Sequence, residues 1–268
     1  MHLSQLYLHP VKSCRGFAVP SATVDEYGLV GDRRFMVVTA DDGQFLTQRA
    51  HPRMALIETA LANATLTLSS AHHGSVTVLG SPLTGHRSLS VTVWKNHVIA
   101  DDCGDEPAEW LSRFLGLSVR LVRIGEQFNR PVSLKRAGDG HQVSFADGFP
   151  FLIVSEASLE HLNSRLATPL PMNRFRPNFV IAGCEAHAED TWNRYRIGNL
   201  IFRNVDPCAR CPITTTDQLT AERGKEPLKT FATYRRDPRD HTDVIFGYNV
   251  VHESKRGEVR VGDPLVLL

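Results

Sequence analysis

The chain has 268 residues, a length typical of two modest domains or one large domain. Its 30 Lys and Arg residues nearly balance its 29 Asp and Glu residues, which excludes a polybasic surface as the main feature, and we expect no nucleic-acid partner. Hydrophobic residues make up 42% of the chain, enough to bury a core, and no apolar run approaches the roughly 18 residues that a membrane-spanning helix requires.

The first five residues show no basic segment leading into an apolar one, the pattern that is typical of an export signal. Five cysteines are too few at this length for a disulfide scaffold, and they favour a reducing compartment. We therefore expect a cytoplasmic globular protein with no membrane partner.

The first third of the chain is predicted to form short strands. Residues 64–68 and 89–93 alternate apolar and small polar side chains, as half-buried strands do. Residues 35–38 and 55–57 are short β-prone apolar runs, and a hairpin turn is expected at 41–43 because Gly43 tolerates a positive φ. Strands this closely spaced favour a small sheet or barrel over βαβ units.

Helices are predicted at three places. One begins near Asp105 and Pro107, where apolar residues recur every 3.6 residues, and a second follows Ser155, a favourable N-cap. The third is short and spans 229–236. Strands are predicted at 119–124, 179–182, 244–251 and 259–268.

Residues 125–149 form a long polar stretch with four glycines and no periodicity of its own. A connection of this length is usually functional or disordered. We interpret it as the link between a β-rich N-terminal part and an α+β C-terminal part, with a lid over a site between them as an alternative.

The strongest local cluster is the C-x-x-C pair formed by Cys208 and Cys211. Structural zinc requires two further ligands at suitable spacing, and no such pair is present. A thioredoxin-like dithiol requires a helix that opens at the first cysteine, whereas Pro212 and the threonines after it resemble loop and strand. A turn with two buried thiols remains open. The other cysteines are isolated, at Cys14, Cys103 and Cys184.

A further interpretation is that one thiolate binds a soft metal or a metal cofactor, because thiolate sulfur suits such centres. The neighbouring Arg210 would favour the ionised thiol. Anion-binding groups for a phosphorylated cofactor occur at residues 12–16, 32–34 and 174–178, although each alone is more often a solvated charge at a strand end. From the residues alone, no reaction follows.

Taken together, these segments resemble the family of MOSC-domain molybdenum cofactor proteins, which includes the amidoxime-reducing component and its bacterial relatives. The resemblance covers essentially the whole chain, with its motifs in order. It implies an α+β, mostly β fold, with a MOSC N-terminal β-barrel domain over residues 1–124 and a MOSC domain over 125–268. The motifs lie at 9–16, 31–35, 47–53, 155–159, 174–178, 207–217, 225–228 and 261–265.

The resemblance also implies a bound molybdenum cofactor (Mo-molybdopterin). Cys211 matches the cysteine that ligates molybdenum and is the expected catalytic and metal-binding residue, whereas Cys208 is expected to be structural. In such sites the cofactor carries the chemistry and the protein supplies orientation and electrostatics. The expected cofactor-binding residues are Lys12, Ser13, Arg34, Ser155, Arg176, Asn178 and Arg210.

The implied reaction is the reduction of small N-oxygenated compounds, such as amidoximes and N-hydroxylated bases. No C-x4-C-x2-C spacing for an iron–sulfur cluster is present, so we expect electrons from a separate protein of the ferredoxin, flavoprotein reductase or cytochrome type. Two alternatives are a cofactor-binding or sulfur-carrier protein without turnover and a zinc- or dithiol-stabilised β protein.

Overall fold

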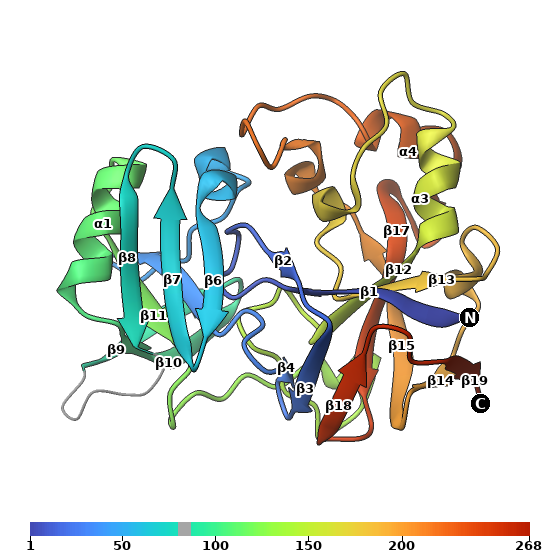
Figure 1. Cartoon of the computed structure of the whole chain (residues 1–268), viewed down its shortest axis with the longest axis horizontal. Helices are drawn as coiled ribbons and strands as arrows, with labels where there is room; N and C mark the ends of the chain where they lie inside the picture. The colour runs from blue at the N-terminus through green and yellow to red at the C-terminus, as the bar shows by residue number, and fades with distance from the viewer. Residues whose placement is uncertain (80–86) are drawn as a thin grey trace.

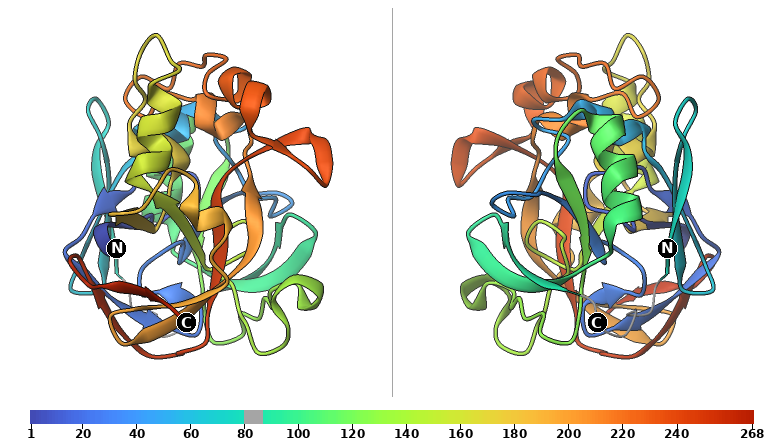
Figure 2. Two further views of the ribbon diagram at one scale, coloured as in Figure 1. Left: turned by 90° about the vertical axis from the view of Figure 1, so that its right-hand side faces the viewer. Right: turned by 90° about the vertical axis from the view of Figure 1, so that its left-hand side faces the viewer.

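The computed structural model describes residues 1–79 and 87–268. Strands dominate, and they lie in two groups along the long axis of the molecule (Figure 1). The helix α1 (Asp105–Leu115) covers one end, and α3 (Glu156–Asn163) and α4 (Leu228–Tyr234) lie at the other, as the side views confirm (Figure 2). The protein is thus a mostly-β α+β fold, as predicted.

The largest sheet has nine strands and is built mainly from the second half of the chain. The first strand of the chain also belongs to this sheet, because β1 pairs antiparallel with β13. The two termini lie close together (Figure 1). In sheet order the strands are β19 (Leu265–Leu267), β14 (Arg194–Ile197), β15 (Leu200–Ala209), β17 (Asp240–His252), β12 (Phe151–Ser155), β13 (Phe179–Ala182), β1 (His2–Leu8) and β2 (Phe17–Ala18), with β16 (Arg236–Asp237) beside β17.

Three smaller sheets complete the fold. One has four strands, one is a three-stranded meander beside α1, and the third ties the N-terminal region to the C-terminal region through the pairing of β3 with β18. Their strands are β5 (Phe35–Thr39), β11 (Val119–Arg123), β10 (Asn96–Asp102) and β9 (Ser88–Val93); β6 (Glu58–Ala62), β7 (Thr65–Ser70) and β8 (Gly74–Leu79); and β18 (Gly257–Arg260), β3 (Ser21–Asp25) and β4 (Gly28–Leu29).

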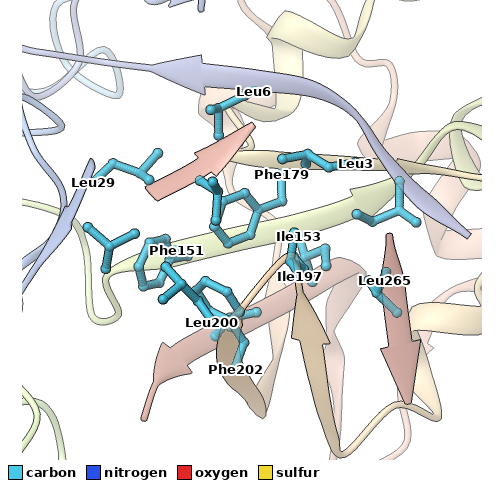
Figure 3. Close-up of a cluster of buried hydrophobic side chains, with 14 of the residues drawn as sticks. Leu3, Leu6, Leu29, Phe151, Ile153, Phe179, Ile197, Leu200, Phe202 and Leu265 are labelled. Atoms are coloured by element: carbon cyan, nitrogen blue, oxygen red, sulfur yellow. The ribbon is translucent and has the colours of Figure 1, made fainter. Parts of the chain in front are cut away.

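An aromatic cluster forms the centre of the C-terminal core (Figure 3). The rings of Phe151 and Phe179 stack with their centroids 5.1 Å apart, and Phe202 meets both edge-on at 5.4 and 5.2 Å. Leucines of the N-terminal strands β1 and β4 pack against this cluster. The start of the chain therefore contributes to the core on which the C-terminal sheet depends.

Most predicted elements are present, and the errors have physical reasons. The predicted strand at 55–57 is part of a 3-10 helix, η1 (Pro52–Leu56), because Pro52 lacks a donor for a ladder and favours the first turn of a helix. The predicted strand at 259–268 is broken into β18 and β19 by a turn in which Gly262 has φ 97°. The threonine run begins as a 3-10 helix, η4 (Pro212–Thr215), and not as loop and strand.

The segment 125–149 contains one short helix, α2 (Leu134–Ala137). Arg130 pins the end of this segment, because its guanidinium donates to the carbonyls of Ser144, Ala146 and Asp147 at 2.5–2.8 Å. Arg136 of α2 pairs with Asp206 on β15. Arg130 thus holds the segment together internally, and Arg136 attaches it to the C-terminal sheet.

His252 makes folding stability depend on pH. This side chain is fully buried, its Nε2 lies 2.6 Å from the Asp25 carbonyl, and its Nδ1 has no hydrogen-bond partner among the described residues. Burial lowers its pKa to about 4, and Lys255 and His141 act in the same direction, against the Asp25 carbonyl. The unfolded chain therefore binds more protons between about pH 6.5 and 4.

We expect this stabilisation to be complete above about pH 6.5 and to be lost as the pH falls towards 4, with a slope of at most about 1.4 kcal/mol per pH unit from this residue. Urea titrations at pH 7 and pH 5 measure the free energy of unfolding. His252→Gln, which keeps a donor for the Asp25 carbonyl, should flatten this pH dependence. An unchanged slope would contradict the role of His252.

Candidate active site

A cavity of about 130 Å³ lies between residues from both halves of the chain. The N-terminal half contributes the turn after β1, Arg33 in the turn that precedes β5, and Arg49. The C-terminal half contributes the segment before β12, the segment before β13 and the end of β15. The polar and sulfur-bearing lining residues are Lys12, Ser13, Arg33, Arg49, Asp147, Arg176, Asn178, Cys208, Arg210, Cys211 and Asn249.

A bulge directs the end of β15 into this cavity. Pro207 pairs with Tyr248 and Ala209 with Ile245, so two residues of β17 face one residue of β15. Gly247 is one of these two and has φ 73°, a conformation that glycine adopts without strain. A Cβ at this position would lie 2.6 Å from the carbonyl oxygen of Ile153. The bulge requires glycine, and it shapes the end of the strand that carries Cys208 and leads to Cys211.

The two cysteines of the C-x-x-C pair differ in their surroundings. Both are free thiols that line the cavity. Cys208 accepts a hydrogen bond from Arg210 Nη1 at 2.8 Å, and burial raises its pKa, with Arg210 opposing the effect. The sulfur of Cys211, at the start of η4, makes no hydrogen bond to the described residues. Cys211 is therefore the thiol that remains open to a ligand.

Positive charge is concentrated and partly buried here. Lys12 is only 4% exposed, and burial lowers its pKa to about 8 although Asp147 opposes the shift. Burial, followed by repulsion from Arg33, lowers the pKa of Arg176 to about 10. Arg210 Nη2 donates to the Phe175 carbonyl at 2.8 Å, while its buried Nε makes no hydrogen bond within residues 1–79 and 87–268. The positive charge of these side chains would stabilise an anion bound in the cavity.

The backbone of the cavity is strained at three places. Ser13, Arg33 and Arg176 have φ values of 67°, 48° and 55°, in the left-handed region that non-glycine residues rarely adopt. Such conformations cost about 1–3 kcal/mol each and persist where the surrounding contacts enforce them, often at functional sites. Here those contacts include the bond from Arg33 Nη2 to the carbonyl of Arg176, at 3.0 Å.

Six of the eight site residues predicted from the sequence line the cavity. Asn178 is 1% exposed, and its amide bridges Arg33 Nη1 and the Tyr7 carbonyl, so it braces the site through its neighbours. The six are Lys12, Ser13, Arg176, Asn178, Arg210 and Cys211.

The other two predicted residues lie outside the lining. Arg34 donates to Asp25 and to the Leu29 carbonyl, which stabilises the β3–β4 turn. Ser155 is fully buried and is the N-cap of α3, where its Oγ accepts a hydrogen bond from the Ser158 amide at 3.1 Å. The structure thus places both of these side chains in local structural roles.

Three charged lining residues were not predicted from the sequence: Arg33, Arg49 and Asp147. Arg33 and Arg49 lie inside the motifs at 31–35 and 47–53, so their position next to predicted anion-binding residues could have identified them. Asp147 lies in the 125–149 segment and had no such signal. It is the only carboxylate among the lining residues that the structure describes.

Among the residues that the structure describes, no group of three or more His, Cys, Asp or Glu side chains is arranged to hold a metal ion. No helix in residues 1–79 or 87–268 is long and apolar enough to cross a membrane.

Comparisons with known proteins place the chain in a family. Residues 1–118 match the MOSC N-terminal beta barrel domain, and residues 140–266 match the MOSC domain. The mitochondrial amidoxime-reducing component 1 of Mus musculus is 38% identical, and that of Homo sapiens is 36% identical; each alignment covers 99% of this chain and 82% of the relative. Component 2 of Bos taurus is 33% identical, over 98% of this chain and 82% of the relative. With both domain models matched and alignments over nearly its whole length, the chain belongs to the MOSC family that contains the mitochondrial amidoxime-reducing components.

Proposed function

We propose that the protein is a molybdenum-cofactor-dependent reductase of N-oxygenated compounds such as amidoximes and N-hydroxylated bases, supplied with electrons by a separate protein. The observation that supports this most is the open Cys211 thiol in a cavity lined by cations. The relatives support the same reaction, because their names describe amidoxime reduction.

The donor set suits a phosphorylated cofactor with a soft metal. Five lining side chains are cationic and one is a carboxylate, an imbalance that a bound anion would neutralise. The Nε atoms of Arg49 and Arg210 are buried and have no hydrogen-bond partner in the part of the chain that the structure describes. Thiolate sulfur is a ligand that suits soft, redox-active metals. The cavity therefore offers both an anion cradle and one metal-binding sulfur.

In this proposal the cofactor lies between the two domains, 1–124 and 125–268. Cys211 would ligate the metal, while Lys12, Ser13, Arg176 and Arg210 would hold the pterin and its phosphate. Asn178 would act through Arg33, whose Nη1 donates to its amide oxygen at 3.0 Å. When bound, the cofactor supplies the two-electron chemistry that breaks the N–O bond and releases the oxygen as water.

Metal analysis and turnover test this function together. The purified protein should contain near-stoichiometric molybdenum and, when partly reduced, show a molybdenum electron paramagnetic resonance signal. With an artificial reductant it should convert benzamidoxime to benzamidine. Molybdenum without turnover would favour the carrier protein instead, and zinc alone would favour the zinc-stabilised β protein.

Arg176→Ala should weaken cofactor retention. Loss of charge-assisted hydrogen bonds to an anion costs about 1.5–3 kcal/mol, or roughly 10–150-fold in affinity. The measurement is the molybdenum content after extended dialysis. Arg174→Ala is the matched control, because Arg174 pairs with Asp217 and does not line the cavity. Unchanged molybdenum in the Arg176 variant would show that this arginine is only structural.

A further inference from the structure

Asp147 lies where three hollows meet. It lines the cavity that contains Cys211 and also two neighbouring hollows of about 590 and 550 Å³. The first of these is walled by the aromatic side chains of Phe45, Trp94 and Phe149. The carboxylate is 57% exposed, so it is accessible from the openings although its neighbours are packed. A molecule that enters the cavity through these hollows passes this side chain.

The contacts of Asp147 hold one oxygen and leave the other accessible. Oδ1 accepts hydrogen bonds from Lys12 Nζ and from the Trp94 indole Nε1, the latter at 3.2 Å. Among the described residues, Oδ2 makes no hydrogen bond, and its one ion pair is with Arg49 Nη2 at 3.8 Å. Trp94 is itself fixed between the Phe45 ring, 4.8 Å away, and the Arg49 guanidinium, 4.4 Å from its ring centre.

The backbone beneath the carboxylate is also fixed. Arg130 is 3% exposed and donates to the carbonyl of Asp147 at 2.8 Å, while Lys12 donates to the carbonyl of Phe145 at 2.9 Å. Partial withdrawal from solvent would raise the pKa of Asp147, but Lys12 and then Arg49 outweigh this effect and hold the pKa well below its usual range. The group is a pre-positioned, ionised hydrogen-bond acceptor in a site otherwise lined by donors.

We propose that Asp147 is a specificity-determining residue, whose carboxylate accepts hydrogen bonds from N–H groups next to the N–O bond of the substrate. This inference rests on the proposed function. The site then favours amidoximes and other N-hydroxylated amidines over N-oxides that lack an N–H group. The aromatic hollow accommodates a flat apolar substituent on the same substrate.

The chemistry of the reaction gives the same carboxylate a second ligand, the product. An amidoxime, R–C(NH2)=N–OH, takes up two electrons from the external donor and two protons, and gives the amidine R–C(NH2)=NH and one water. The amidine then binds a further proton at neutral pH and becomes a cation. Amidinium presents two parallel N–H groups, as guanidinium does, and a carboxylate accepts such a pair in fork geometry. Asp147 therefore binds the product side of the reaction more strongly than the substrate side.

The test compares two substrates on the holoprotein. Benzamidoxime carries N–H groups beside its N–O bond, and pyridine N-oxide, which also takes up two electrons and two protons, carries none. Asp147→Asn should raise the KM for benzamidoxime about 10-fold or more and leave that for pyridine N-oxide within about 2-fold. The molybdenum content should not change. Equal changes for both substrates would overturn the inference.

Asp190→Asn is the matched control, because it breaks a partly buried ion pair with Arg235 away from the cavity. It should change neither KM. Since Asp147→Asn leaves Lys12 without its carboxylate partner, Asp147→Glu is a second variant that keeps the charge and should retain part of the preference.

A binding measurement separates this inference from the proposed function. Calorimetric titration of the wild-type protein with benzamidine should give a Kd at least about 10-fold lower than for Asp147→Asn, whether or not turnover occurs. If neither N-oxygenated compound is reduced, the proposed function fails, and benzamidine binding alone then decides the role of Asp147. Equal benzamidine affinity in the two proteins would refute that role.

Discussion

Replacement of Cys211 by Ala is expected to lower the reduction of benzamidoxime by more than about 100-fold, because removal of groups that only orient metal ligands already costs 10–100-fold. Cys211 is the thiol without a hydrogen bond to the described residues, whereas Cys208 is engaged by Arg210 at 2.8 Å. The molybdenum electron paramagnetic resonance signal should be lost or shifted in the Cys211→Ala protein, since alanine has no sulfur that could bind the metal.

Cys208→Ala is the matched control on the same turn. It should mainly reduce the free energy of unfolding, by about 1–3 kcal/mol, because Arg210 Nη1 loses its acceptor. Cys208→Ser keeps an acceptor there and should recover part of that stability. If both cysteine variants lost activity equally, the assignment of a single metal thiolate would be wrong.

Phe179→Ala is expected to destabilise the protein by about 3–5 kcal/mol, a large fraction of the total stability of a typical protein. Phe179 is fully buried and lies between Phe151 and Phe202, and both ring contacts would be lost together (Figure 3). The cavity left behind cannot close easily, because the neighbouring strands β12 and β1 are hydrogen-bonded on either side of β13.

The free energy of unfolding from urea titration measures this effect. Leu219→Ala is a suitable control, since Leu219 is 71% exposed and its loss should change stability by less than about 0.5 kcal/mol. Phe179→Leu, which keeps most of the apolar volume, should fall between the two. A Phe179→Ala protein as stable as the control would mean that the aromatic cluster is not the centre of the core.

Local patterns predicted those elements whose structure depends on neighbours in sequence. The helix α1 begins after Gly104 and ends at Gly116, which adopts φ 70°, and its apolar face is buried as the periodicity predicts. Ser155 caps α3 by its own side chain. Strand β3 was not predicted, and its pairing partner β18 lies far away in the sequence.

The candidate site shows the same division. The motif around Arg33 and Arg34 identified an anion-binding segment, but only the backbone at Arg33, with φ 48°, decides which of the two side chains enters the cavity. Similarly, Ser155 belongs to a motif of the family and yet caps a helix. A motif identifies a segment, whereas the direction of each side chain depends on φ and on contacts.

The sequence by itself determined the fold class, the family and the cysteine pair with its nearby cations, because these depend on residue identity, order and short-range pattern. Only the tertiary structure decided that Cys211 is the open thiol, that Arg33 and Arg49 line the cavity in place of Arg34, and that Asp147 is the carboxylate at its entrance. The reason is that the cavity is formed by segments far apart in the chain, such as those of Lys12, Cys211 and Asn249, and long-range strand pairing sets their distances.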